Sequence, residues 1–175
     1  NEAIEAFKKA ISIKPEFAEA YNNIGLELHN QGKLDKAKEA YNKAILIRPN
    51  YVDAYNNIGI TLKVQGELDK AIQSYKKAIS LQPNYAKAYI NMGNVLKEQG
   101  KLDEALFANK KAISINPNYA EAYKNSGLIL IDQGKMNEAF ESFNKALSIE
   151  PNLPSAHYGC SIIHNLQGNL EKGFK

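Results

Sequence analysis

The sequence has little of what disulfide-stabilised or membrane proteins rely on. Its 175 residues include one cysteine, Cys160, and no tryptophan. A single cysteine excludes an internal disulfide, so we expect a reducing compartment such as the cytoplasm. No stretch approaches the roughly 20 apolar residues that a membrane-spanning helix needs, and we expect no membrane contact. The chain begins Asn1-Glu2-Ala3 with no signal-like stretch and reads as part of a longer protein.

The sequence also lacks a strong charge bias and any catalytic motif. Its 22 basic and 19 acidic residues are interspersed and leave a net charge of +3. No basic run forms a stripe for phosphates, so we expect no nucleic-acid partner. There is no Gly-rich phosphate loop, nucleophile elbow or regular acid–base pair, so we expect no enzymatic activity and no cofactor.

What the sequence does contain is a strict internal repeat of 34 residues. Several independent series share this spacing, which indicates a stack of similar structural units. The prolines are Pro15, Pro49, Pro83, Pro117 and Pro151. One glycine series is Gly25, Gly59, Gly93 and Gly127, and a second is Gly32, Gly66, Gly100, Gly134 and Gly168. One of three alanine series is Ala20, Ala54, Ala88, Ala122 and Ala156.

Each unit reads as two helices joined by a tight turn. In residues 18–51, the first helix is predicted to run from Ala18 to Gln31 and to stop at Gly32. Asp35 can cap the second helix, and Pro49 ends it. The buried stripe predicted for the first helix is Tyr21, Ile24, Gly25 and Leu28, and that for the second is Ala37, Tyr41, Ala44 and Ile45.

Small residues in both helices predict close packing within each hairpin. Ala20 and Gly25 on the first helix and Ala37 and Ala44 on the second let the backbones approach, while Tyr21 and Tyr41 fill the remaining space. A larger residue at Gly59 should overpack this contact and cost about 1–3 kcal/mol.

The run Ala-x-x-Tyr-x-x-Ile-Gly-x-x-Leu, followed by Gly-x-Leu-x-x-Ala-x-x-x-Tyr-x-x-Ala and Pro, resembles the tetratricopeptide repeat. The resemblance covers nearly the whole chain. It implies an all-α fold, an α-solenoid of stacked antiparallel helical hairpins that form a right-handed superhelix. The full repeats are 18–51, 52–85, 86–119 and 120–153, flanked by partial repeats at 1–17 and 154–175. The departures are Asn109 in place of a second-helix aromatic, Ser126, His157 and Gly173, and we expect weaker packing at Asn109 and Ser126.

First helices line the concave side of such a solenoid, and one asparagine series falls there. An amide offers two donors and an acceptor, so a row of amides can pair with the backbone of an extended peptide. We call the series Asn23, Asn57, Asn91 and Asn125 the asparagine ladder. An adjacent strip, mostly apolar, holds Leu26, Ile60, Asn94 and Leu128, and Asn22 and Asn56 complete the predicted peptide-binding residues. The predicted function is therefore a scaffold that binds a protein or peptide partner.

Three alternatives stay open at this point. The ladder can instead serve packing between neighbouring repeats, since the repeat consensus often carries asparagine there. Residues 83–98 resemble repeats of the O-linked N-acetylglucosamine transferase, which implies a substrate-recognition region of a larger glycosyltransferase. Uncovered apolar residues at both ends, such as Phe7 and Ile162, favour a structural solenoid that associates end to end. The carboxylate clamp of chaperone-binding members is not matched. The candidate lysine and arginine positions hold Glu19, Asp53, Lys87 and Glu121, and no arginine replaces an asparagine.

Two further groups of residues invite a functional reading. His157, Cys160 and His164 share a helix face and are of the types that bind zinc. Because they occupy repeat positions of buried residues, we expect them in the core and predict no metal site. His29 is expected to be a solvated groove residue. Tyr51, Tyr85 and Tyr119 are expected to pack between repeats.

Overall fold

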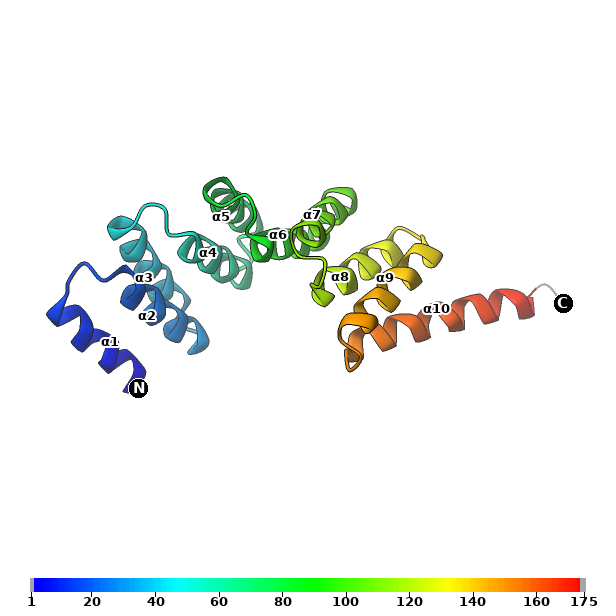
Figure 1. Cartoon of the computed structure of the whole chain (residues 1–175), viewed down its shortest axis with the longest axis horizontal. Helices are drawn as coiled ribbons and strands as arrows, with labels where there is room; N and C mark the ends of the chain where they lie inside the picture. The colour runs from blue at the N-terminus through cyan, green and yellow to red at the C-terminus, as the bar shows by residue number, and fades with distance from the viewer. Residues whose placement is uncertain (1, 174–175) are drawn as a thin grey trace. The chain divides into compact units, whose positions relative to one another are not determined.

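The computed structural model describes the backbone of residues 2–173 and the side chains of residues 2–166. Across this part of the chain the structure contains ten α-helices and no strand, which confirms the all-α helical-hairpin solenoid (Figure 1). The helices are α1 (Glu2–Ile13), α2 (Ala18–Asn30), α3 (Leu34–Ile47), α4 (Val52–Val64), α5 (Leu68–Leu81), α6 (Ala86–Glu98), α7 (Leu102–Ile115), α8 (Ala120–Asp132), α9 (Met136–Ile149) and α10 (Pro154–Gly173).

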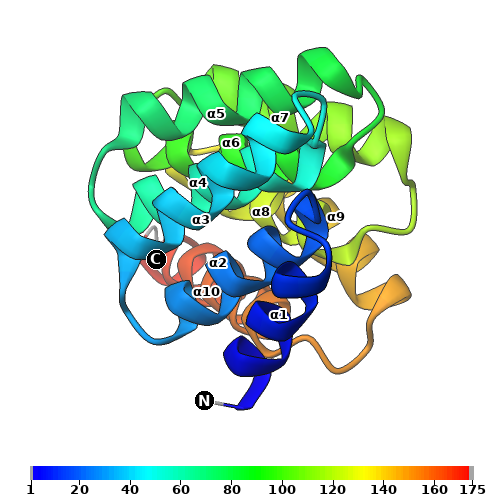
Figure 2. The ribbon, with the colours of Figure 1, turned by 90° about the vertical axis from the view of Figure 1, so that its left-hand side faces the viewer.

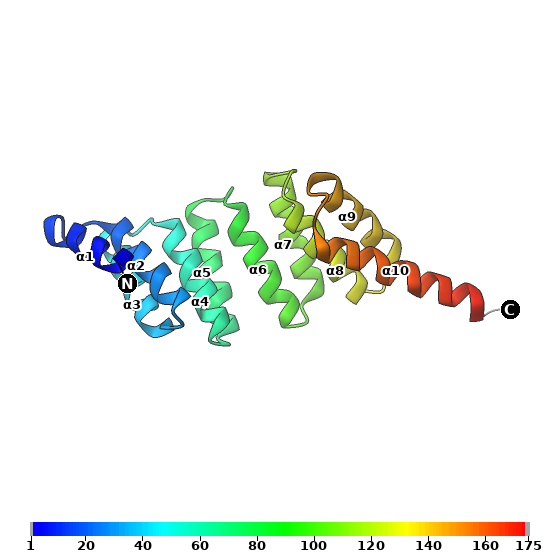
Figure 3. The same ribbon diagram turned by 90° about the horizontal axis from the view of Figure 1, so that it is seen from below.

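The chain divides into two compact units, residues 1–88 and 89–175. In the first unit, α2 packs against α3 and α4 against α5 as hairpins, while α1 packs on α2 and α3 packs on α4. In the second unit, α8 and α9 form a hairpin, α7 packs on α8, and α10 packs on α9 (Figure 3). Within the two units, α1, α3, α7 and α9 therefore each contact the first helix of the hairpin that follows.

The helix ends follow the predicted turn signals. Gly32, Gly66, Gly100 and Gly134 have φ of 72°, 77°, 75° and 75° respectively, a left-handed conformation that favours glycine and stops the first helices. The second helices end just before the prolines; α3, for example, ends at Ile47 and Arg48 has extended backbone.

The predicted cap of the second helix is wrong. Lys33 holds the N-cap position of α3 and makes no side-chain cap bond. Asp35 lies inside the helix and accepts a hydrogen bond from Gln65 Nε2 at 3.0 Å. Asp103 accepts an equivalent bond from Gln133 Nε2 at 2.9 Å. These carboxylates therefore link one hairpin to the next instead of capping their own helix.

The close packing predicted within each hairpin is confirmed. Ala37 is fully buried and Tyr41 is 1% exposed. A Cβ added at Gly25 would lie 2.5 Å from Tyr41 Cε1, so only glycine leaves room for the ring. Gly59 has the same relation to Tyr75, and a Cβ added at Gly127 would lie 2.7 Å from Phe143 Cε1.

The predicted first-helix stripe is less buried than expected in α2. Tyr21, Ile24 and Leu28 are only half-buried there, although Gly25 is buried. The leucine of the same repeat position is buried in α4 and α8, as Leu62 and Leu130. Tyr51 packs against a buried cluster of Ala18, Ala44 and Ala54, as expected for a residue that seals adjacent hairpins.

Asn109 and Ser126 interrupt the packing pattern of the second unit. Asn109 is fully buried where other hairpins carry an aromatic ring, and its Nδ2 donates to Ala105 O at 3.0 Å. Its Oδ1 is buried without a hydrogen-bond partner among the described residues. Ser126 is also buried, but its hydroxyl donates to Ala122 O at 2.8 Å. The packing defect is therefore concentrated at Asn109.

The last helix departs from the predicted hairpin. A turn was expected at Gly168, yet α10 continues without a break to Gly173. Phe174 lies outside the described residues.

The histidines and the cysteine of α10 are not in the core. His157 and His164 are exposed and Cys160 is half-buried, so the expectation of burial is wrong. The buried residues of α10 are instead Ala156, Gly159 and Ile163, one position along the helix from the expected stripe. Gly159 meets the Phe143 ring, and this contact sets the rotation of the helix.

Candidate peptide-binding site

In the first unit, the ladder residues lie on α2 and α4. Asn23 and Asn57 are half-buried, whereas Asn22 and Asn56 are 7% and 5% exposed. Asn57 Nδ2 donates to Asn22 Oδ1 at 3.1 Å. Asn22 therefore lies beneath the surface and holds a ladder amide of the following hairpin, a role that its repeat position alone did not reveal.

In the second unit, the ladder residues lie on α6 and α8. Asn91 is half-buried and Asn125 is 6% exposed. Asn125 Nδ2 donates to Asn94 Oδ1 at 2.8 Å. Asn94 belongs to the predicted strip, so here the strip and the ladder are joined across adjacent first helices. Both observed amide links run from a ladder residue back to the preceding first helix.

The apolar part of the strip remains accessible. Leu26 is 43% exposed on α2, and Ile60 on α4 is half-buried. In the second unit, Leu128 is half-buried on α8. Each unit therefore presents apolar surface beside at least one ladder amide.

Two ladder amides, those of Asn23 and Asn57, keep unused hydrogen-bonding capacity. An asparagine amide has two N–H donors and an oxygen with two lone pairs. Asn57 uses one donor in its bond to Asn22. Within the described residues, the side chain of Asn23 makes no hydrogen bond, and it is half-exposed on α2. These groups can therefore pair with the backbone of an added chain.

A histidine link between hairpins was not predicted. His29 is half-buried, and its Nδ1 lies 2.9 Å from Thr61 Oγ1, so it is not simply a solvated groove residue. Thr61 is fully buried and its hydroxyl donates to Asn57 O at 2.9 Å. Burial raises the pKa of the neighbouring Tyr41 to about 12. A hydrogen bond with Thr61 lowers this pKa, but its effect is smaller than that of burial. The link fixes the backbone that carries the Asn57 ladder amide.

The acidic residues that replace the carboxylate clamp have partners within the chain. Glu19 forms an ion pair with Arg48, and the hydrogen bond from that guanidinium lowers the pKa of the Glu19 carboxyl. The guanidinium carbon of Arg48 in turn lies 4.7 Å from the centre of the Tyr51 ring. On the next hairpin, Tyr85 donates its hydroxyl to Asp53 Oδ1 at 2.6 Å. These acidic residues therefore contact the turns between helices, and they do not form a cationic clamp.

Other kinds of site find no support in the described part of the chain. Among these residues, no three His, Cys, Asp or Glu side chains are grouped so that they could hold a metal ion. Within the same residues, no helix combines the length and apolarity needed to cross a membrane.

Comparisons with known proteins agree with this architecture. One tetratricopeptide repeat model matches residues 1–32, 62–100 and 127–168, a second matches 18–51 and 86–119, and a third matches 40–73. A search of curated proteins finds no match.

Solved structures of similar fold include those of MamA, YrrB and PilF. MamA is 32% identical, with a TM-score of 0.74 and coverage of 85% of this chain and 86% of its own. YrrB, described as a TPR protein with an unusual peptide-binding site, is 27% identical over 97% of this chain and 87% of its own, with a TM-score of 0.75. PilF of Pseudomonas aeruginosa is 26% identical, with a TM-score of 0.81 and coverage of 87% of this chain and 69% of its own. The repeat matches and the hairpin packing agree, and the chain belongs to the tetratricopeptide repeat family.

Proposed function

We propose that the chain binds extended peptide segments of a partner protein on its first-helix surfaces, through the ladder amides of each unit. Membership of the repeat family supports a protein-interaction role in general. The observation that favours this particular surface is the state of Asn23 and Asn57. Both are only half-buried, and they carry unused amide groups on the helices that also present the exposed Leu26 and the half-buried Ile60.

The proposed contact combines polar and apolar terms. Each amide–backbone hydrogen bond contributes about 0.5–1.5 kcal/mol net. Burial of an exposed leucine such as Leu26 adds at most about 1.5–3 kcal/mol. Because association has a large entropic cost, we expect micromolar dissociation constants. The neighbour YrrB is itself described as peptide-binding, which is consistent with such a surface.

The competing role for the ladder is packing between hairpins, and two neighbouring asparagines separate the two roles. Asn22 is buried and accepts the hydrogen bond from Asn57, whereas Asn23 is half-exposed with no side-chain bond in the described chain. Asn22→Ala should lower the free energy of unfolding by about 1 kcal/mol, because the Asn57 amide loses its hydrogen-bond acceptor. Asn23→Ala should leave stability unchanged and weaken peptide binding.

The experiment is a screen of a diverse peptide library against the immobilised chain, followed by affinity measurements on the variants. The proposal predicts peptide hits whose affinity falls at least about fivefold with Asn23→Ala, equivalent to about 1 kcal/mol. A folded variant with both Asn57 and Asn91 changed to alanine should lose the hits altogether. Equal binding by Asn23→Ala and the original chain would assign the ladder to structure alone.

Self-association is a second candidate, and exposed apolar side chains on α10 favour it. Tyr158 is 69% exposed and Leu166 is 44% exposed. A second copy that covered these side chains would be stabilised by about 25 cal/mol for each Å² of apolar surface buried. Light scattering over a range of concentrations tests this role: a constant monomer mass would exclude it. The glycosyltransferase alternative rests on the likeness of residues 83–98 and calls for a catalytic domain in the parent protein.

A further inference from the structure

A second surface, separate from the ladder, is a groove of ≈ 410 Å³ between α1 and α3. Helix α2 packs against both of these helices (Figure 2). Its side chains form the floor of the groove. The floor residues are Tyr21, Ile24 and Leu28, and Ile11 of α1 extends the apolar lining. The incomplete burial of the α2 stripe is thus the exposed floor of a groove. Its volume falls within the range of about 300–1,000 Å³ typical of ligand sites.

The groove faces away from the ladder. Successive residues of an α-helix are turned by about 100°. On α2, Asn23 and Leu26 therefore lie on the far side from Ile24 and Leu28. A ligand in the groove and a peptide on the ladder would contact different faces of the same helix, so the two surfaces can be tested independently.

The rim of the groove is mainly cationic. Lys8, Lys36 and Lys43 line it, and Glu39 is the one acidic residue in that lining. Among the described residues, neither Lys36 nor Glu39 has a hydrogen bond or ion pair. Lys43 Nζ lies 5.7 Å from the centre of the Tyr21 ring, directly beside the apolar floor. Cationic groups thus stand where they can meet the carboxylates of a ligand whose apolar side chain enters the groove.

An adjoining pocket of ≈ 380 Å³ extends the groove along α2 and shares Lys8, Ile24, Leu28 and Lys36 with it. The two are lined along α2 from Tyr21 to Gln31, the residue that directly follows the helix. At 1.5 Å per helical residue this distance is about 15 Å, which accommodates about four or five extended residues at 3.3–3.6 Å each. The added lining contributes one further lysine, Lys33, and Glu5, which is paired with Lys8 at 2.9 Å.

We propose that this groove binds a short acidic peptide segment with an apolar anchor, in which one or two large apolar side chains contact Ile24 and Leu28 and flanking carboxylates pair with Lys36 and Lys43. A second copy of the chain is a poorer fit. The exposed apolar face of α10 around Tyr158 and Leu166 has no Asp or Glu between residues 154 and 166 to meet these lysines.

The test uses three capped pentapeptides whose binding is followed by NMR and calorimetry. They are Glu-Asp-Leu-Phe-Glu, its basic counterpart Lys-Lys-Leu-Phe-Lys, and Glu-Asp-Ser-Gly-Glu, which keeps the charge and lacks the apolar anchor. Only the first should bind measurably, with the amide signals of Ile24, Leu28 and Lys36 shifting. Equal binding of all three, or of the first and third, would overturn the proposal.

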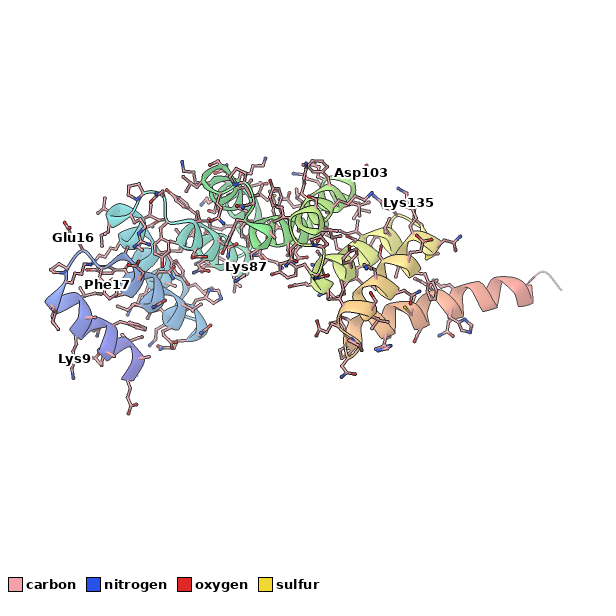
Figure 4. The ribbon with its side chains drawn as sticks, in the orientation of Figure 1. Lys9, Glu16, Phe17, Lys87, Asp103 and Lys135 are labelled. Carbon is pink, nitrogen blue, oxygen red and sulfur yellow. The ribbon has the colours of Figure 1, made fainter. Side chains whose placement is uncertain are left out.

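Two double variants change the net charge by the same amount. Comparing them distinguishes contacts within the groove from the effect of the net charge of the protein. Lys36→Glu with Lys43→Glu should weaken the first peptide by about tenfold or more, since two attractive surface pairs become repulsive. The control is Lys9→Glu with Lys14→Glu, exposed residues outside the groove; Lys9 projects outward from α1 (Figure 4). An equal loss in both variants would overturn the proposal.

Two further outcomes are decisive. Asn23→Ala should leave binding of the acidic peptide unchanged, and a loss there would mean that the peptide occupies the ladder surface. If the chain self-associates, and Lys36→Glu with Lys43→Glu abolishes association while the peptide fails to compete, the occupant is a second copy and the proposal is wrong.

Discussion

Replacing Asn109 with phenylalanine should stabilise the protein. Asn109 is fully buried, and its Oδ1 has no partner among the described residues. Removing such an unsatisfied buried acceptor recovers about 1–3 kcal/mol. The equivalent residue of the following hairpin, Phe143, is likewise fully buried and contacts Gly127. Gly93 occupies the matching position opposite Asn109 and leaves the same kind of space.

Phenylalanine is a better choice than tyrosine for a specific reason. The hydroxyl of Tyr41 meets Thr61 of the next hairpin. The residue at the corresponding place after Asn109 is Ile129, which has no polar side-chain atom to pair with a buried hydroxyl. A tyrosine would therefore replace one unsatisfied polar group by another, and part of the gain would be lost.

The assay is urea unfolding followed by circular dichroism. We expect Asn109→Phe to raise the free energy of unfolding by about 1–3 kcal/mol, with a rise in melting temperature of about 2–4 °C per kcal/mol. Asn42→Phe, at an exposed position, is the control and should change stability by less than about 0.5 kcal/mol. A destabilised Asn109→Phe would show that α6 and α7 have closed around the smaller side chain, and would refute the reasoning.

Three other perturbations follow from the same contacts. Gly59→Ala places a Cβ 2.5 Å from Tyr75 Cε1, and urea unfolding should show a loss of about 1–2 kcal/mol, as overpacking outweighs the gain in helix propensity. The raised pKa of Tyr41, about 12, favours the neutral phenol, so its contribution to stability is complete below pH 10 and is lost as pH rises toward 12. Burial also raises the pKa of Tyr75, so an ultraviolet titration should show Tyr41 and Tyr75 among the last tyrosines to ionise, and Tyr41→Phe should remove one of these late transitions. The pKa of the Glu19 carboxyl is lowered in the folded protein, so its ion pair with Arg48 stabilises the fold fully above pH 4.5, the ordinary pKa. This stabilisation is lost as pH falls through the pKa of the folded state. Arg48→Gln should raise the pKa of Glu19 in an NMR titration.

Residue periodicity was sufficient to predict the helices and their internal packing. The glycines with positive φ, the prolines after each hairpin, and the contact of Gly25 with Tyr41 all repeat at one spacing. Each of these features is local to one hairpin. Sequence positions within a single repeat therefore carry the information that determines them.

Contacts between hairpins were harder to predict. Asp35 was read as a helix cap because aspartate favours that position, but it pairs with Gln65 of the next hairpin. Asn22 and Asn57 pair across a similar distance along the chain. Such pairs depend on the relative rotation of two hairpins, which the pattern of one repeat does not specify. The rotation of α10 was misjudged for the same reason, because the contact of Gly159 with Phe143 determines it.

The most direct test of peptide recognition by the ladder follows the side-chain amide signals of Asn23 and Asn57 by NMR while a library-selected peptide is added. The account predicts that both signals shift with one dissociation constant, and that Asn23→Ala weakens binding while its unfolding curve stays unchanged. Unmoved ladder amides together with undiminished affinity in Asn23→Ala would contradict it.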